Sequence, residues 1–110
     1  MKEKDVTKQI RDVLKACKVW HFKHFSTLGS MPGVSDIIGC YQGRMIAIEV
    51  KTPGWKQPLP GTKAYKHFKE QEGFLFHVNQ NGGIGFFASS VETVVEKLGL
   101  QVKLFPLFKR

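Results

Sequence analysis

The sequence predicts an α/β domain in which a mixed central β-sheet is flanked by helices, with the element order α-β-β-β-α-β-α. Three observations lead to this expectation. Apolar residues recur at helical spacing in some segments, short aliphatic or alternating runs mark strands, and Gly, Pro and Asn residues separate them. The 110 residues are enough for one core, so we expect a single domain over 1–110.

The first third of the chain predicts one helix and one strand. Apolar positions at helical spacing predict a helix over residues 4–18. The aromatic-rich segment 19–25 then predicts a strand that places Trp20 and Phe22 on one face. Residues 26–33 are rich in Gly, Ser and Pro, which favours a loop.

The segments 36–41 and 44–50 predict a β-hairpin, because two aliphatic runs are separated by Gln42 and Gly43. A two-residue turn pairs the residues directly on either side of it, and each further step adds one residue to both strands. The apolar residues at alternate positions of the second strand then point into the core.

The same register places Asp36 opposite Glu49. Directly opposed side chains have Cβ atoms about 5 Å apart. Lys51 lies two residues beyond Glu49 and shares its face of the sheet. A three-residue loop would shift the register by one and separate the two acids across the sheet. The competing interpretation is a half-exposed strand whose outward residues happen to be charged.

The second half of the chain predicts an irregular loop, two helices and a strand. Pro and Gly residues over 53–61 exclude regular structure there. An apolar stripe predicts a helix over 62–80, and 84–88 is a short strand. The capping-box sequence at 89–92 predicts the start of a final helix that ends near Gly99.

The chain carries 17 Lys and Arg against 9 Asp and Glu, a formal charge of +8, which indicates a polyanionic partner. DNA is the simplest such partner. An anionic membrane surface is the rival, disfavoured because no strongly amphipathic basic helix is evident in the sequence. The residues expected to contact nucleic acid are Trp55, Lys56, Lys63, Lys66 and Lys69.

No stretch is long and apolar enough to span a membrane, and the charged first residues give no sign of a signal peptide. We therefore expect a cytoplasmic protein without a membrane partner. Cys17 and Cys40 each lie in an apolar pattern and are expected to be buried free thiols.

Two opposed carboxylates repel each other unless a positive charge lies between them, and a divalent cation with oxygen ligands such as Mg²⁺ or Mn²⁺ is the natural occupant. Asp36 and Glu49 would hold this ion. Lys51 would orient or deprotonate a water and help to neutralise a phosphate in the transition state. The structural alternative for Lys51 is a surface salt bridge to Glu49.

Asp36 followed by Glu49, Val50 and Lys51 resembles the PD-(D/E)xK nuclease signature. The flanking segments 31–39 and 48–52 resemble its small VRR-NUC branch, and Gln71 with the Asn-Gly-Gly-Ile-Gly stretch that follows it fits that branch too. The resemblance extends from Glu3 to about Leu98. One departure is Ser35, which occupies a position where the broad signature has proline.

This resemblance implies a restriction-endonuclease-like core and a DNA endonuclease that depends on Mg²⁺, with Mn²⁺ able to substitute. It implies the Val50 carbonyl as a third metal ligand and an acid on the first helix as a fourth. Glu3 is the closest match and Asp5 the alternative, although either acid could simply complement the helix dipole. Gln71 would bind the water or a phosphate, or is a glutamine at the core edge.

The resemblance further implies a substrate of structured or branched DNA, as for Holliday-junction resolvases, and a homodimer without a small-molecule cofactor. The rival function is a non-catalytic nucleic-acid-binding module that keeps the fold and has lost the chemistry. The apolar tail is a candidate part of the dimer surface; its residues are Leu104, Phe105, Leu107 and Phe108.

Overall fold

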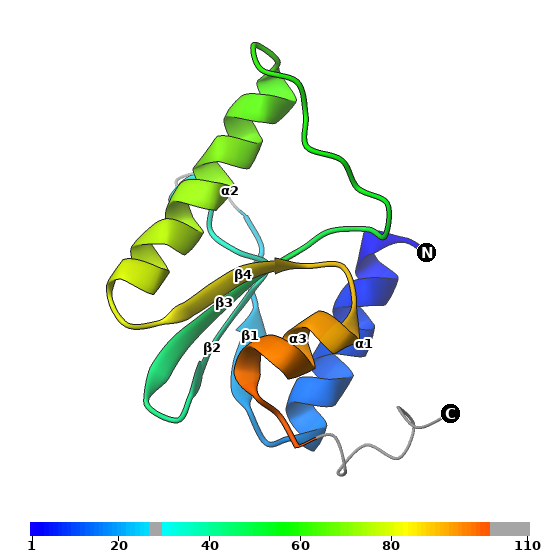
Figure 1. Ribbon diagram of the computed structural model, residues 1–110, viewed down its shortest axis with the longest axis vertical. Coiled ribbons are helices and arrows are strands. Elements are labelled where there is room, and N and C mark those ends of the chain that lie inside the picture. Colours follow the sequence, from blue (N-terminus) through cyan, green and yellow to red (C-terminus); the bar gives the residue numbers. More distant parts are fainter. Residues whose placement is uncertain (27–29, 102–110) are drawn as a thin grey trace.

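The described part of the chain, residues 1–26 and 30–101 of a computed structural model, forms an α/β fold with the predicted element order (Figure 1). Its sheet is mixed, with helices on both sides. Among these residues no helix is long and apolar enough to cross a membrane. The elements are α1 (Glu3–Ala16), β1 (Trp20–Lys23), β2 (Ile37–Tyr41), β3 (Arg44–Val50), α2 (Lys63–Gln80), β4 (Ile84–Ala88) and α3 (Val91–Leu98).

The sheet has the strand order β1-β2-β3-β4. Strands β1, β2 and β3 pair antiparallel, whereas β3 and β4 pair parallel. The parallel pair needs a crossover connection, and α2 supplies it. Consequently α2 lies across β3 and β4, on the face opposite α1 and α3 (Figure 1).

The β2–β3 hairpin has the register that the sequence predicts. Gln42 and Gly43 both have positive φ, 52° and 78°, as a two-residue type I′ turn requires. Tyr41 therefore pairs with Arg44, and the ladder continues to Ile37 opposite Ile48. Asp36 directly precedes Ile37 and Glu49 directly follows Ile48, so the two acids lie side by side where the ladder ends.

The larger core lies between the sheet and helices α1 and α3. Ile46, Ile48 and Val50 of β3 are fully buried there, as the alternation along the strand predicts. The core under α2 is smaller, with Ala47, Leu75 and Val78 as its fully packed members. One face of β3 thus belongs to a large apolar core, and the other face leaves room for polar groups.

Helix α2 begins and ends near the predicted boundaries. Thr62 caps its start by accepting a hydrogen bond from the Tyr65 N–H at 3.1 Å.

The loop before β2 packs directly on this helix, because a Cβ on Gly33 would lie 2.2 Å from the Glu70 carbonyl oxygen. Gly33 also has a φ of +78°, a conformation that favours glycine. This contact fixes the loop that leads to Asp36 against α2.

The expectation that both cysteines are buried is wrong. Cys40 is exposed, because it lies on the part of the sheet that α2 does not cover, whereas Cys17 is half-buried. Trp20 and Phe22 share a face as predicted, with ring centroids 5.7 Å apart, and that face is open to solvent. The apolar tail lies outside the described residues.

Candidate functional site

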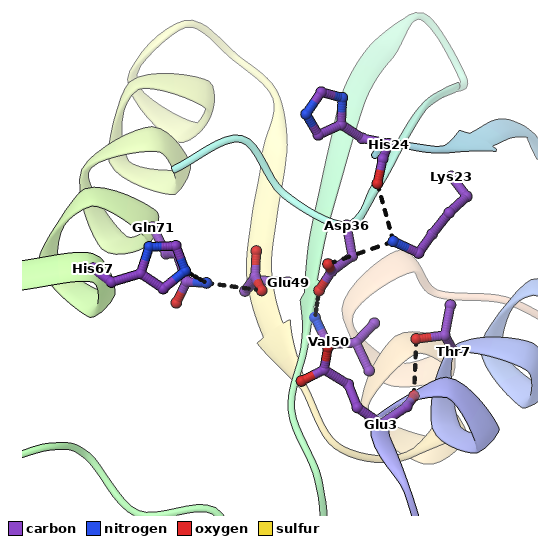
Figure 2. Close-up of polar contacts among 9 residues, drawn as sticks. All are labelled: Glu3, Thr7, Lys23, His24, Asp36, Glu49, Val50, His67 and Gln71. Atoms are coloured by element: carbon purple, nitrogen blue, oxygen red, sulfur yellow. Dashed lines mark hydrogen bonds and ion pairs between the residues drawn. The ribbon is translucent and has the colours of Figure 1, made fainter. Parts of the chain in front are cut away.

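Two carboxylates meet where β2 and β3 stop pairing. Asp36 precedes the first residue of β2, and its Oδ2 accepts a hydrogen bond from the Val50 N–H at 2.8 Å (Figure 2). Glu49 is the neighbour of Val50 on β3. Because the N–H and the carbonyl of a strand residue point toward the same neighbouring strand, the Val50 carbonyl also lies on the Asp36 side.

Glu49 is buried, with 4% of its surface exposed. Burial is the largest cause that raises its pKa, to about 9, and the neighbouring Asp36 carboxyl raises it further. The positive charge of Lys51 acts in the opposite direction. Burial and the neighbouring Asp36 carboxyl therefore both favour the protonated form of Glu49.

Gln71 links Glu49 to Lys51. Its Nε2 donates to Glu49 Oε2 at 3.1 Å, and its Oε1 accepts from Lys51 Nζ at 2.9 Å. Only one orientation of the amide gives oxygen to the ammonium group and nitrogen to the carboxyl. Gln71 is 6% exposed, so this arrangement is shielded from bulk water. The predicted common face of Glu49 and Lys51 is confirmed, since both contact the same side chain of α2.

Aromatic rings surround the ammonium group of Lys51. Its Nζ lies 4.8 Å from the centre of the Trp55 ring and 5.8 Å from that of Phe87. Lys51 thus reaches Glu49 through Gln71 and is held by two rings, which is a different arrangement from the direct surface salt bridge considered above.

On the opposite side, Asp36 contacts β1. Lys23 Nζ lies 3.7 Å from Asp36 Oδ1, with both side chains largely buried. The same ammonium group donates to the His24 carbonyl at 3.0 Å (Figure 2). The His24 N–H in turn donates to the Asp36 carbonyl at 2.7 Å. Lys23 therefore supplies a positive charge beside Asp36.

The two acidic candidates on α1 have different surroundings. The Asp5 carboxylate accepts a hydrogen bond from the Lys2 N–H at 3.1 Å and so caps the start of the helix. Glu3 lies within electrostatic range of Glu49 and contributes to its raised pKa. Of the two, Glu3 is the acid that faces the pair of carboxylates.

The donors available to a cation are few. Within residues 1–26 and 30–101, no three His, Cys, Asp or Glu side chains are grouped so that they could hold a metal ion, so Glu3 does not complete a set with Asp36 and Glu49. Two carboxylates and the Val50 carbonyl fit Mg²⁺, which takes one or two protein carboxylates and keeps several waters. The residues present therefore suit an open magnesium site and do not form an all-protein cage.

The residues predicted to contact nucleic acid have varied surroundings, and of these Trp55 contacts Lys51 of the site. Trp55 stacks on Phe87 at 6.2 Å between ring centroids and also contacts Phe68, so part of its ring supports the fold. Lys69 forms an ion pair with Glu72. The remaining three, Lys56, Lys63 and Lys66, are exposed, and their contact with nucleic acid stays a prediction.

The polar side chains around the two acids form one connected cluster, and its members are Asp36, Glu49, Lys51, Gln71, His67 and Lys23. The last two were not predicted from the sequence. His67 Nε2 lies 3.2 Å from Gln71 Nε2, one helical turn away, and the spacing of four residues on α2 was a usable signal. Lys23 cannot be identified from its local sequence, because nothing there indicates that β1 lies beside Asp36.

Comparison with protein-family models, with curated proteins and with solved structures gave no match for this chain.

Proposed function

We propose that this protein is a metal-dependent endonuclease that hydrolyses phosphodiester bonds in DNA, with a restriction-endonuclease-like core of the VRR-NUC type. The observation that carries the proposal is the register of the β2–β3 hairpin, which places Asp36 beside Glu49 with the Val50 carbonyl on the same side. Lys51 lies on the same face, linked to Glu49 through Gln71.

In this proposal Asp36, Glu49 and the Val50 carbonyl hold Mg²⁺, or Mn²⁺ in its place. When bound, the ion would supply positive charge to a phosphodiester whose negative charge increases in the transition state. Lys51 orients the attacking water and helps to neutralise that charge. Gln71 fixes both Glu49 and Lys51, so it acts as a positioning residue.

The proposed substrate is structured or branched DNA, and the proposed assembly is a homodimer in the cytoplasm. A net charge of +8 supports a nucleic-acid partner. The exposed pair Trp20 and Phe22 on the uncovered half of the sheet is an apolar surface that a second copy could cover. Sedimentation of the full chain, compared with that of Trp20→Ser, would test the dimer.

The deciding experiment is a cleavage assay on labelled linear duplex, single strand, flap and four-way junction, with Mg²⁺, Mn²⁺, Ca²⁺ or EDTA. Cleavage that needs Mg²⁺ or Mn²⁺ and is lost in Asp36→Asn and Lys51→Ala supports the proposal. Lys97→Ala is the matched control, because Lys97 is exposed on α3, away from the cluster. Binding of DNA without cleavage by the folded wild type in every condition would instead favour the non-catalytic binding module.

A second readout is independent of catalysis. Mg²⁺ that binds the folded state should raise the melting temperature of the wild type, and Asp36→Asn should reduce this rise. An equal rise in both proteins would place the ion elsewhere and contradict the proposed ligands.

A further inference from the structure

A groove of about 570 Å³ lies along α1, and Asp36, Glu49 and Lys51 are not among the residues that line it. One wall is the solvent side of α1, and the other is formed by the residues at the end of β1. The residues that line it are Glu3, Lys4, Thr7, Lys8, Arg11, Asp12, Lys15, Lys23 and Phe25.

The charges along this groove are mostly positive: five cations against two acids. The four on α1 recur at intervals of three or four residues, so they form one stripe on the helix. Lys8 pairs with Asp12 at 3.0 Å, but both side chains are more than half exposed and such a pair contributes little. Helix α1 thus carries a basic stripe on its solvent side, a feature absent from the sequence-based expectation that no strongly amphipathic basic helix is present.

The apolar side of α1 is not available to a membrane. Val6, Ile10 and Leu14 are at most 1% exposed and belong to the core between α1, α3 and the sheet. A helix that binds in a membrane interface needs its apolar face free for the lipid. The basic stripe therefore faces solvent as a surface for a water-soluble polyanion.

Arg11 is held in position from inside the protein. Its Nε donates to His21 Nε2 at 3.3 Å, and His21 Nδ1 lies 2.9 Å from the Val19 carbonyl. Burial lowers the pKa of His21, so its ring is neutral and Nε2 accepts while Nδ1 donates. This contact uses one of the five guanidinium donors, and the others stay available to a phosphate.

Phe25 supplies an aromatic surface in the groove. It is 72% exposed, and Lys23 Nζ lies 4.8 Å from the centre of its ring. A single exposed Phe is ordinary, but one that lines a basic groove matches the pairing of cations and stacking rings in single-strand binding proteins.

Two of the residues that line the groove also lie near the pair of acids. Lys23 lines the groove and also lies 3.7 Å from Asp36. Glu3 lines the groove and lies within electrostatic range of Glu49. Figure 2 shows Glu3 and Lys23 reaching the site from α1 and β1 respectively.

We propose that this groove binds a single-stranded segment of nucleic acid, with its phosphates along the basic stripe of α1 and an unpaired base stacked on Phe25. The inference rests on the proposed function, because it places this strand next to the proposed cleavage site. The stripe from Lys4 to Lys15 is about 17 Å long at 1.5 Å per helical residue. At 3.4 Å per phosphate it spans about five phosphates of a stacked strand. The substrate class that follows is DNA with a single-stranded arm beside the cleaved bond.

The test measures binding of a short labelled oligothymidine by fluorescence anisotropy, in EDTA so that cleavage is absent, over a series of salt concentrations. The double variant Lys4→Gln/Lys15→Gln should weaken binding about fivefold or more and reduce the salt slope by about 0.7 per lost phosphate contact. The matched control, Lys18→Gln/Lys97→Gln, removes the same charge outside the groove and should leave the slope unchanged. Circular dichroism verifies that both variants are folded.

Phe25→Leu keeps an apolar side chain but removes the stacking ring. It should weaken binding of the oligothymidine about fivefold or more and leave binding of a blunt duplex unchanged. The proposal that the groove binds a single strand would be wrong if both double lysine variants weakened binding equally, or if Phe25→Leu had no effect. Binding to vesicles of anionic lipid in preference to the oligonucleotide would also contradict it.

These outcomes separate the groove from the nuclease. In one outcome the wild type cleaves DNA, while Lys4→Gln/Lys15→Gln and Phe25→Leu change neither the rate nor the substrate preference. That result would refute strand binding in the groove but not the nuclease. The expected binding pattern without cleavage of any DNA would support the groove and refute the nuclease.

Discussion

The two faces of the sheet bury β3 in opposite ways. Toward α1 and α3, Ile48 and Val50 are completely buried in a continuous apolar core. Toward α2, Glu49 is buried almost as deeply at 4% exposure, but among polar partners. Neighbouring residues on one strand thus have the same degree of burial with opposite chemistry. This difference indicates that stability comes mainly from the α1 and α3 face, while the α2 face keeps a carboxyl where a hydrocarbon would be more stable.

The largest expected effect comes from Glu49→Gln, which keeps the shape and the contact with Gln71. If Glu49 holds the metal ion, cleavage should fall about 10³-fold, which corresponds to about 4 kcal/mol. Stability should change in the opposite direction. The pKa of Glu49 is raised from 4.5 to about 9 in the folded state, so the folded protein retains a proton that the unfolded chain releases.

It follows that the free energy of unfolding of the wild type loses up to about 1.4 kcal/mol per pH unit from this group as pH rises between these two values. Glu49→Gln lacks this loss, so its advantage over the wild type should grow with pH. Urea denaturation of both proteins at several pH values measures the difference. A constant difference across the range would show that Glu49 has an ordinary pKa.

On the other face, Ile48→Ala should destabilise the protein by about 2–5 kcal/mol, because it leaves a cavity in a closely packed core. The rate of cleavage per folded molecule should stay close to that of the wild type. Ile48→Val is the milder version, with an expected cost of about 0.5–1.5 kcal/mol. A loss of cleavage in Ile48→Val without loss of stability would contradict the division between the two faces.

Substitution of Gly33 tests whether close packing on α2 positions the loop that leads to Asp36. Gly33→Ala combines a positive φ of +78° with a Cβ only 2.2 Å from the Glu70 carbonyl oxygen, so we expect a loss of about 3 kcal/mol in stability. Gly54→Ala is the matched control, with a φ of +85° and nothing within 4 Å of its Cβ. It should cost only about 1 kcal/mol of backbone strain.

Thermal denaturation of both glycine variants separates the clash from the strain. Because Gly33 packs on the backbone of Glu70 and Gln71, the variant should also lower cleavage in the fraction that folds. Equal costs at the two positions would show that the loop before Asp36 can move away from α2.

Much of the fold and the pairing of the two acids could be predicted from local sequence. Gln42 and Gly43 fix the hairpin register, and this register alone brings Asp36 to Glu49. The contacts of Lys23 with Asp36 and of Gln71 with Glu49 cannot be derived in the same way. They depend on where β1 and α2 pack against the hairpin, and that packing is decided by side-chain shape over the whole core, which no local spacing encodes.

The smallest expected effect concerns Ser35, a polar residue that is completely buried just before Asp36. Its Oγ has no hydrogen-bond partner among the described residues. An unpaired buried hydroxyl is unfavourable, so Ser35→Ala should raise the free energy of unfolding by about 1 kcal/mol.

Ser90→Ala is the matched control, because Ser90 Oγ accepts the Thr93 N–H at 3.3 Å and caps α3. The same substitution there should lower stability by about 1 kcal/mol. Urea denaturation of the two variants side by side measures both signs. Destabilisation by Ser35→Ala would mean that the hydroxyl is bonded in solution, and that the approach to Asp36 is held by a polar contact as well as by Gly33.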